Sequence, residues 1–213
     1  MTSWQRRIAR AAELEKRVPA AAEILRFYIA VGQASWPVCL PDQLRETVAR
    51  HGPPLLAEAA HNHAEPAESF IARVLRRAEA VDTAAPNQIP VGKTCNTCPF
   101  CGERPVAAVL RPEGEGGKRY LLCSLCLTEW EFRRMLCPNC GEENHEKLPV
   151  YTTKELPHVR VEACDSCRHY LKAIDLTVDG LAVPEVDEIA AIALDLWAAE
   201  NGYTKLAPNL FEL

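Results

Sequence analysis

The sequence predicts an α+β protein: a helical N-terminal domain followed by two tandem rubredoxin-like zinc ribbons and a closing C-terminal helix. Two observations predict this arrangement. Apolar residues recur at helical spacing before residue 82 and after residue 186. Between them, four Cys-x-x-Cys pairs are separated by short β-type runs. With 48% hydrophobic and 25% charged residues over 213 positions, the chain has the composition of an ordinary globular protein.

The N-terminal domain is expected to cover residues 1–82, and the proline-containing segment 83–94 is expected to be a linker. Proline and glycine positions divide this domain into four predicted helices, over residues 4–18, after Pro19, over residues 41–51 and from Pro66. In the second helix, Phe27, Tyr28 and Val31 recur at the spacing of a buried stripe, which predicts a packed helical core.

The cysteine pairs predict two metal sites. Two residues between cysteines let a tight turn aim both sulfur atoms at one ion. Intervals of 21 and 23 residues separate the first pair from the second and the third from the fourth, and each interval reads as a β-hairpin. The first ribbon is therefore expected over residues 95–136 and the second over 137–175. The predicted metal ligands are Cys98, Cys101, Cys123, Cys126, Cys137, Cys140, Cys164 and Cys167.

Alternatives remain open on the sequence alone. The four pairs could act as independent buried or redox-active thiols, although their duplication at matching intervals favours two sites of four cysteines each. A cross-braced arrangement, with the first pair joined to the third, is disfavoured because each hairpin closes its own site. Zinc and iron both accept four thiolates. Leu127 and Arg168 stand where rubredoxin-type iron sites favour glycine, which makes zinc the better fit. Two structural metal ions are therefore expected, with zinc favoured over iron.

The remaining cysteines are expected to lie outside the metal sites. Cys95 forms a further Cys-x-x-Cys with Cys98 and is expected to be a free thiol, with a spare ligand as the alternative. Cys39 is expected to be a core or half-buried thiol. A closed site of four cysteines has no open position for substrate or water, and no nucleophile or carboxylate constellation accompanies it. The sequence therefore predicts that the protein is not an enzyme.

Residues 176–213 are expected to form the closing helix, over about 186–201, and an acidic tail. Ile189, Ile192 and Leu196 are spaced as its buried face. Residues 173–213 contain eight acidic residues and one basic residue, and the whole chain has a formal net charge of −5. This charge disfavours nucleic-acid binding. With no apolar run near the ~20 residues of a membrane span and no export signal, the protein is expected to be cytoplasmic.

The sequence around the cysteine pairs is similar to that of a known family. The pairs read C-P-F-C-G, C-S-L-C, C-P-N-C-G and C-D-S-C, and Thr128-Glu129-Trp130 and Tyr170-Leu171-Lys172 follow the second and fourth. The chain ends with Gly202-Tyr203 and Pro208-Asn209-Leu210-Phe211. This order resembles the FdhE family of bacterial formate dehydrogenase accessory proteins, whose members are longer, so the helical N-terminal domain is expected to be shortened.

The resemblance implies a cytoplasmic factor that makes formate dehydrogenase active by binding its catalytic subunit. It also suggests partner contacts beyond the metal ligands, at Trp130, Arg134, Asp165, Ser166 and Tyr170. Each has a structural alternative: packing between ribbons, an ion pair with Glu129 or Glu131, or a hydrogen bond within its own turn. The second functional interpretation is a redox protein whose rubredoxin-like ribbons hold iron and act on a client. The sequence does not determine the oligomeric state.

Overall fold

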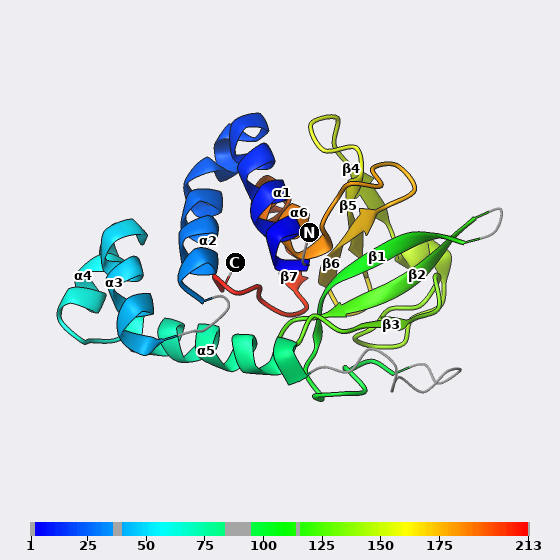
Figure 1. Cartoon of the computed structure of the whole chain (residues 1–213). Coiled ribbons are helices and arrows are strands. Elements are labelled where there is room, and N and C mark those ends of the chain that lie inside the picture. Colours follow the sequence, from blue (N-terminus) through cyan, green and yellow to red (C-terminus); the bar gives the residue numbers. More distant parts are fainter. Residues whose placement is uncertain (1–2, 36–39, 84–94, 114–115, 213) are drawn as a thin grey trace. The chain divides into compact units, whose positions relative to one another are not determined.

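The computed structural model describes residues 3–35, 40–83, 95–113 and 116–212. The chain divides into two compact units, Met1–Thr83 and Ala84–Leu213 (Figure 1). Cys39 and all of the predicted linker except Thr83 lie outside the described residues. Among the described helices, none combines the length and the apolar character that crossing a membrane requires.

The first unit is helical. Its elements are α1 (Ser3–Arg17), the short 3-10 helix η1 (Pro19–Ala21), α2 (Ala22–Ser35), α3 (Pro41–His51), α4 (Pro54–His61) and α5 (Ala67–Thr83). The sequence predicts four α-helices here and none between residue 51 and Pro66, where two prolines at 53 and 54 favour a break, but Pro54 begins α4. A proline fits the first turn of a helix because its missing N–H would have no partner there. The same residue pair therefore ends one segment and begins a helix.

Aromatic packing holds the helical unit together. Phe27, Tyr28 and Val31 are buried on α2, as their spacing predicts. The ring of Phe27 stacks on that of Phe70 from α5, with 5.4 Å between centroids. Arg45 on α3 adds a two-pronged ion pair with Glu68 on α5, with Nη2 2.8 Å from each carboxylate oxygen. α2, α3 and α5 are thus linked by both apolar and charged contacts.

The second unit is built on one seven-stranded sheet in the order β3-β2-β1-β6-β5-β4, with β7 pairing with β6 off this path. The strands are β1 (Pro105–Glu113), β2 (Gly116–Cys123), β3 (Glu129–Glu131), β4 (Val150–Thr152), β5 (Val159–Ala163), β6 (His169–Asp175) and β7 (Thr204–Lys205). β1, β2 and β3 form the antiparallel first ribbon, and β4, β5 and β6 form the second. Both predicted hairpins are present.

Parallel pairing of β1 with β6 joins the two ribbons. Residues 107–110 of β1 pair with residues 172–175 of β6. An ion pair crosses the same boundary: Nη2 of Arg119 on β2 lies 2.8 Å from Oε2 of Glu162 on β5. Burial disfavours the charged form of Glu162, but Arg119 and Arg160 hold the pKa of this carboxyl below its usual range. The ribbons are therefore one folded body, a feature that the spacing of the cysteines does not predict.

The predicted closing helix is two helices. α6 (Pro184–Ala190) ends at Ala191, where φ is −87° and ψ is 33°, and α7 (Ile192–Glu200) follows. This break changes the direction in which α7 presents its side chains, so the predicted buried face is wrong after Ile189: Leu196 is 63% exposed. Trp197 and Leu194 pack instead against a cluster of Val161, Ala163, Tyr170, Ala198 and Tyr203.

A buried group of alternating charges fastens these helices and β7 to the sheet. Lys172, completely buried on β6, places Nζ 2.9 Å from Oε1 of Glu188 on α6 and 2.5 Å from Oδ2 of Asp195 on α7. Lys205 on β7 contacts the same carboxylates at 2.5 and 3.1 Å. Although burial opposes ionisation, the two lysines lower the pKa of Glu188. Two cations and two anions thus balance inside the fold, and the predicted acidic tail is part of it.

We expect Lys172→Met to destabilise the second unit by about 3–5 kcal/mol, because removing one member of a buried ion pair leaves its carboxylate partners uncompensated. Lys154→Met, at an exposed turn position, is the control and should change the free energy of unfolding by no more than about 0.5 kcal/mol. Urea unfolding followed by circular dichroism measures both. Equal stability of the two variants would contradict a structural role for the buried charges.

Candidate metal centres

All four Cys-x-x-Cys pairs adopt the same tight turn. The backbone N–H of the first cysteine donates a hydrogen bond to the carbonyl five residues later, in Cys98–Glu103 (2.8 Å), Cys123–Thr128 (3.0 Å), Cys137–Glu142 (2.9 Å) and Cys164–His169 (2.9 Å). The residue after the second cysteine has a left-handed backbone, with φ of 81° at Gly102, 57° at Leu127, 77° at Gly141 and 57° at Arg168. The turn is thus repeated four times.

Leu127 and Arg168 adopt the conformation that glycine adopts most easily. Their presence changes the sequence pattern expected of rubredoxin-type iron sites, but it does not change the turn. The sequence argument that favours zinc over iron at these two positions therefore rests on residue identity and not on a difference in backbone geometry.

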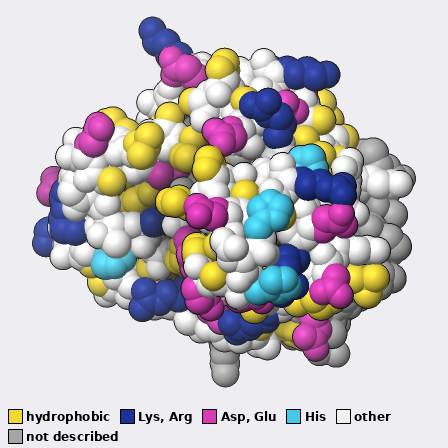
Figure 2. Space-filling model, turned by 90° about the vertical axis from the view of Figure 1, so that its left-hand side faces the viewer, with side chains coloured by type: hydrophobic (Ala, Val, Ile, Leu, Met, Phe, Trp, Pro, Cys, Tyr) yellow, Lys and Arg dark blue, Asp and Glu magenta, His cyan; other side chains and the backbone are white. Residues whose placement is uncertain are grey.

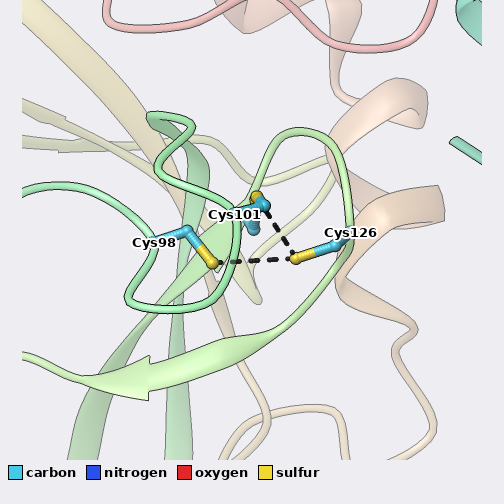
Figure 3. A group of neighbouring side chains, drawn as sticks. Cys98, Cys101 and Cys126 are labelled. Carbon is cyan, nitrogen blue, oxygen red and sulfur yellow. Dashed lines mark hydrogen bonds between the residues drawn. The ribbon is translucent and has the colours of Figure 1, made fainter. Parts of the chain in front are cut away.

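The first centre lies where the hairpin of β1 and β2 brings its flanking turns together. Cys98 and Cys101 come from the turn before β1, and Cys126 comes from the turn after β2, with their sulfur atoms directed toward one another (Figure 3). The Sγ–Sγ distances are 3.7 Å for Cys98–Cys126, 3.6 Å for Cys101–Cys126 and 3.4 Å for Cys101–Cys123. The four cysteines form one group.

The second centre repeats this geometry in the other ribbon. Sγ of Cys137 lies 3.7 Å from that of Cys167, and Sγ of Cys140 lies 3.7 Å from that of Cys164. In each centre all four sulfur atoms lie within 4.8 Å of one another. The first pair thus meets the second and the third meets the fourth, which is the predicted local pairing and not the cross-braced one. Cys140 differs from the other seven cysteines because it is exposed.

The spacing of the sulfur atoms fits a tetrahedral ion. Metal–sulfur bonds of about 2.3 Å in a tetrahedron place neighbouring sulfur atoms about 3.8 Å apart. The sulfur–sulfur contacts of 3.4–3.7 Å in the two centres are near this length. Backbone N–H groups also point at sulfur, from Leu125 to Cys123 and from Asn139 to Cys137, both at 3.4 Å. The eight cysteines can therefore hold two metal ions.

The surroundings favour thiolate at one cysteine of each centre. Cys123 and Cys98 hold the pKa of the Cys126 thiol well below its usual range, while contact with Cys126 raises the pKa of Cys123. In the second centre, burial opposes ionisation of Cys167, but hydrogen bonds from Asn139 and from the backbone of His169 lower its pKa to about 6. A bound ion requires deprotonated cysteines, so each centre has one ligand prepared for binding.

Trp130 and Cys95 are joined by a hydrogen bond. The indole Nε1–H of Trp130, which is buried on β3, donates to the backbone carbonyl of Cys95 at 2.8 Å. This bond ties the segment before the first turn to the edge of the sheet. Cys95 does not belong to the group of four sulfur atoms, in agreement with its expected role as a thiol outside the metal site.

Three other predicted contact residues are engaged within the second unit. The Tyr203 hydroxyl donates to Oδ1 of Asp165 at 2.6 Å, and the Ser166 hydroxyl donates to Oε2 of Glu142 at 2.5 Å. The Tyr170 hydroxyl donates to Oδ1 of Asp195 at 2.7 Å. These three residues therefore support the fold of the unit that contains them.

Arg134 is the exception among the five predicted contact residues. Its side chain is exposed, and it forms no ion pair or hydrogen bond within the described part of the chain. The two acids considered as its partners pair elsewhere: Glu129 with Arg111 at 2.6 Å and Glu131 with Lys118 at 2.8 Å. The ion-pair alternative considered for Arg134 is therefore not formed.

A third group of metal-ligand residue types could not be found from the sequence because its members are far apart in the chain. Ligand atoms of His158, Asp179 and Asp187 lie within 4.8 Å of one another. Nε2 of His158 lies 2.7 Å from Oδ1 of Asp187, whose Oδ2 accepts the N–H of Val183 at 2.7 Å. These hydrogen bonds position the beginning of α6, which accounts for the arrangement.

Comparison with known proteins places both cysteine centres within one family. Residues 97–134 match FdhE, central domain, and residues 135–212 match FdhE, C-terminal domain. The chain belongs to the FdhE family. The FdhE homologue of Aquifex aeolicus is 43% identical over 115 residues, which are 54% of this chain and 41% of that protein. The FdhE homologue of Pseudomonas aeruginosa is 41% identical over 118 residues, 53% of this chain and 38% of that protein.

The crystal structure of the FdhE protein from Pseudomonas aeruginosa is also similar to most of the chain, with a TM-score of 0.63 and 26% identity. The match covers 91% of this chain and 72% of the other. A match of this extent includes much of the helical unit, which the family domains do not cover. The curated FdhE relatives match over about two fifths of their own length.

Metal removal should unfold the two units of this FdhE-family chain in a defined order. Binding of a structural zinc ion contributes about 10–16 kcal/mol of apparent free energy. All eight predicted ligands lie in turns that flank strands of the second unit, and none lies in the helical unit, so loss of the ions should weaken the second unit first. We therefore expect two metal ions per chain by native mass spectrometry. After chelation, hydrogen exchange should show residues 95–172 losing protection before the described helices of residues 3–83. A protected sheet after complete metal removal would contradict this expectation.

Single substitutions should separate the two centres. Cys98→Ser or Cys126→Ser should remove one ion and leave the other, because the four ligands of each centre are contributed by one ribbon. Cys95→Ser is the matched control and should leave both ions in place. Metal content per chain, measured by elemental analysis, gives the result. Loss of both ions from Cys98→Ser would show that the centres do not fill independently.

Proposed function

We propose that this protein is an accessory, chaperone-like factor required for the assembly or activation of formate dehydrogenase, and that it acts in the cytoplasm by binding the catalytic subunit. The observation that carries the proposal is membership of the FdhE family over residues 97–212, the part that contains both cysteine centres. The motifs around the cysteine pairs and the matched family domains lie in the same part of the chain. The two lines of support therefore concern the same residues.

The geometry of the centres supports binding rather than catalysis. Each uses four cysteines, so an ion bound by all of them has no open position at which to activate water or substrate. Such an ion holds turns in place. We propose that two structural zinc ions occupy the centres and keep the ribbons rigid, and that the surface of the second unit recognises the client.

Charge on the surface supports a protein partner rather than a nucleic acid. On the face drawn in Figure 2, Lys and Arg side chains are interspersed with Asp and Glu, with apolar side chains between them. A nucleic-acid site requires a continuous basic patch. The net charge of −5 opposes association with phosphates in the same direction.

Of the five candidate contact residues, we assign client contact to Arg134, because its side chain is exposed and forms no ion pair in the described residues. Trp130, Asp165, Ser166 and Tyr170 are bound to other parts of the second unit. We propose that these four act indirectly by fixing the shape of the ribbons and of the C-terminal segment.

A redox function is the second candidate, and one observation favours it. Cys140 is exposed, which would give an iron ion in the second centre a short path to a redox partner. Ferric thiolate absorbs strongly in visible light and zinc thiolate does not, so the spectrum of the protein purified from its host separates the two. A coloured protein that is reduced and reoxidised reversibly would favour the redox function.

The accessory function predicts a specific phenotype. A host that lacks this protein should contain formate dehydrogenase polypeptide at near-normal amounts but little formate oxidation, because an assembly factor controls activity and not synthesis. Immunoblotting and an activity assay on the same extract measure both. Complementation with the wild type should restore activity, and complementation with Cys126→Ser should fail, because one centre can no longer close.

Normal formate oxidation in the deletion strain would contradict the proposal, because it would exclude a required accessory role. Loss of the polypeptide together with the activity would point to an effect on synthesis or turnover of the enzyme.

A further inference from the structure

A pocket of about 230 Å³ lies between the two ribbons. It is lined by residues of β1 and β2 in the first ribbon, of β4, β5 and β6 in the second, and of the segment 134–139 that connects the ribbons. Arg160 and Glu162 of β5 line it and alternate with Val161, which packs in the cluster beside α7. Ala163, at the end of β5, lines the pocket and also belongs to that cluster. Since neighbouring side chains of a strand point to opposite faces, the charged β5 side chains of the pocket lie on the face of β5 that is turned away from Val161.

Most charges in this pocket are already paired. Glu162 contacts Arg119 at 2.8 Å and Arg160 at 2.9 Å, and Arg160 also lies 3.7 Å from Asp175. Arg134 also lines the pocket, and its guanidinium forms no ion pair with any residue that the structure describes. The pocket thus presents one guanidinium that is available to a ligand.

Glycine at position 117 makes room for this guanidinium. A Cβ added at Gly117 would lie 3.2 Å from Nη2 of Arg134, which is closer than most such contacts. The wall beneath also contains Cys137 and Cys164 of the second centre, whose side chains are buried. The accessible positive charge at the opening belongs to Arg134, which is exposed.

Exposed apolar side chains flank the opening. Met135, next to Arg134, is 50% exposed, and Val150 on β4 is 52% exposed. β4 ends the sheet, so its outer edge pairs with no other described strand. An extended segment can add to such an edge through backbone hydrogen bonds while its side chains enter neighbouring pockets. Met and Arg are also enriched where proteins contact one another.

We infer that this pocket binds an extended segment of a protein partner in which one acidic side chain stands beside an apolar one. The acidic group pairs with Arg134, and the apolar group packs on Met135 and Val150. A small-molecule pocket is usually larger, about 300–1,000 Å³, and encloses most of its ligand, so the half-exposed rim favours a segment of polypeptide. The inference rests on the proposed function in one respect: the partner used to test it is the catalytic subunit of formate dehydrogenase.

Binding of the purified catalytic subunit to the full-length, metal-loaded protein tests the charge pairing. We expect Arg134→Gln to weaken binding by at least about tenfold, because an acidic side chain loses its partner. Arg133→Gln is the matched control: Arg133 is the adjacent, 53% exposed arginine, pairs with Glu143 and does not line the pocket. It should stay within about twofold of the wild type, and both variants should retain two metal ions and the melting temperature of the wild type.

A photo-crosslinking amino acid at position 150 tests the location and the chemistry of the segment. Introduced at Val150, it should crosslink to one peptide of the catalytic subunit that contains Asp or Glu beside an apolar residue. Introduced at Val178, which is 58% exposed and outside the pocket, it should not crosslink to that peptide.

Three other results of the binding experiments would decide against the inference. Equal binding by Arg134→Gln and Arg133→Gln would overturn the inference and leave the proposed function standing. A wild-type protein that does not bind the subunit would overturn both. Stabilisation of the wild type but not of Arg134→Gln by millimolar phosphate, together with no difference in subunit binding, would make the pocket a small-anion site and overturn the inference.

Discussion

The parallel pairing of β1 with β6 is the contact on which the second unit depends, because it converts two separate metal ribbons into one sheet. A parallel pair joins strands that a short turn cannot connect, and here the connection runs through the whole second cysteine centre. The pairing also brings Arg119 within reach of Glu162. Two ribbons that were independent of each other would have neither this ion pair nor a pocket between them.

Joining the ribbons gives the sheet two different faces. On one face, Glu188 of α6 and Asp195 of α7 pair with Lys172 of β6 and Lys205 of β7, and the charges balance inside the fold. The other face has charged residues that pair across the ribbons, and an apolar rim that remains exposed. The helix-covered face contributes stability, and the residues that we propose for recognition lie on the other face, so the two tasks would not compete for the same residues.

The extent to which the sequence predicts this structure follows the distance over which each signal acts. The Cys-x-x-Cys turns and their local pairing were predictable because the ligands of each centre flank one hairpin. The break at Ala191 was not, since no proline or glycine stands there and α7 still has helical composition. The contact between Lys172 and Asp195 was not predictable either, because these two residues lie 23 positions apart in the sequence. Local spacing predicts turns, but it does not predict which distant side chains meet.

The same distinction explains why residues beside the cysteines resemble a recognition motif and yet serve the fold. Asp165 lies in the tip of the fourth turn, where an exposed polar residue suggests a partner, but its partner is Tyr203 in the same chain. Arg168 reaches the backbone carbonyl of Asn201 at 2.6 Å and lies 3.9 Å above the ring of Tyr203. The turn that closes a metal centre thereby also holds the C-terminal segment. An ion in the second centre would therefore stabilise more than its own hairpin, because the position of α7 and β7 depends on the shape of that turn.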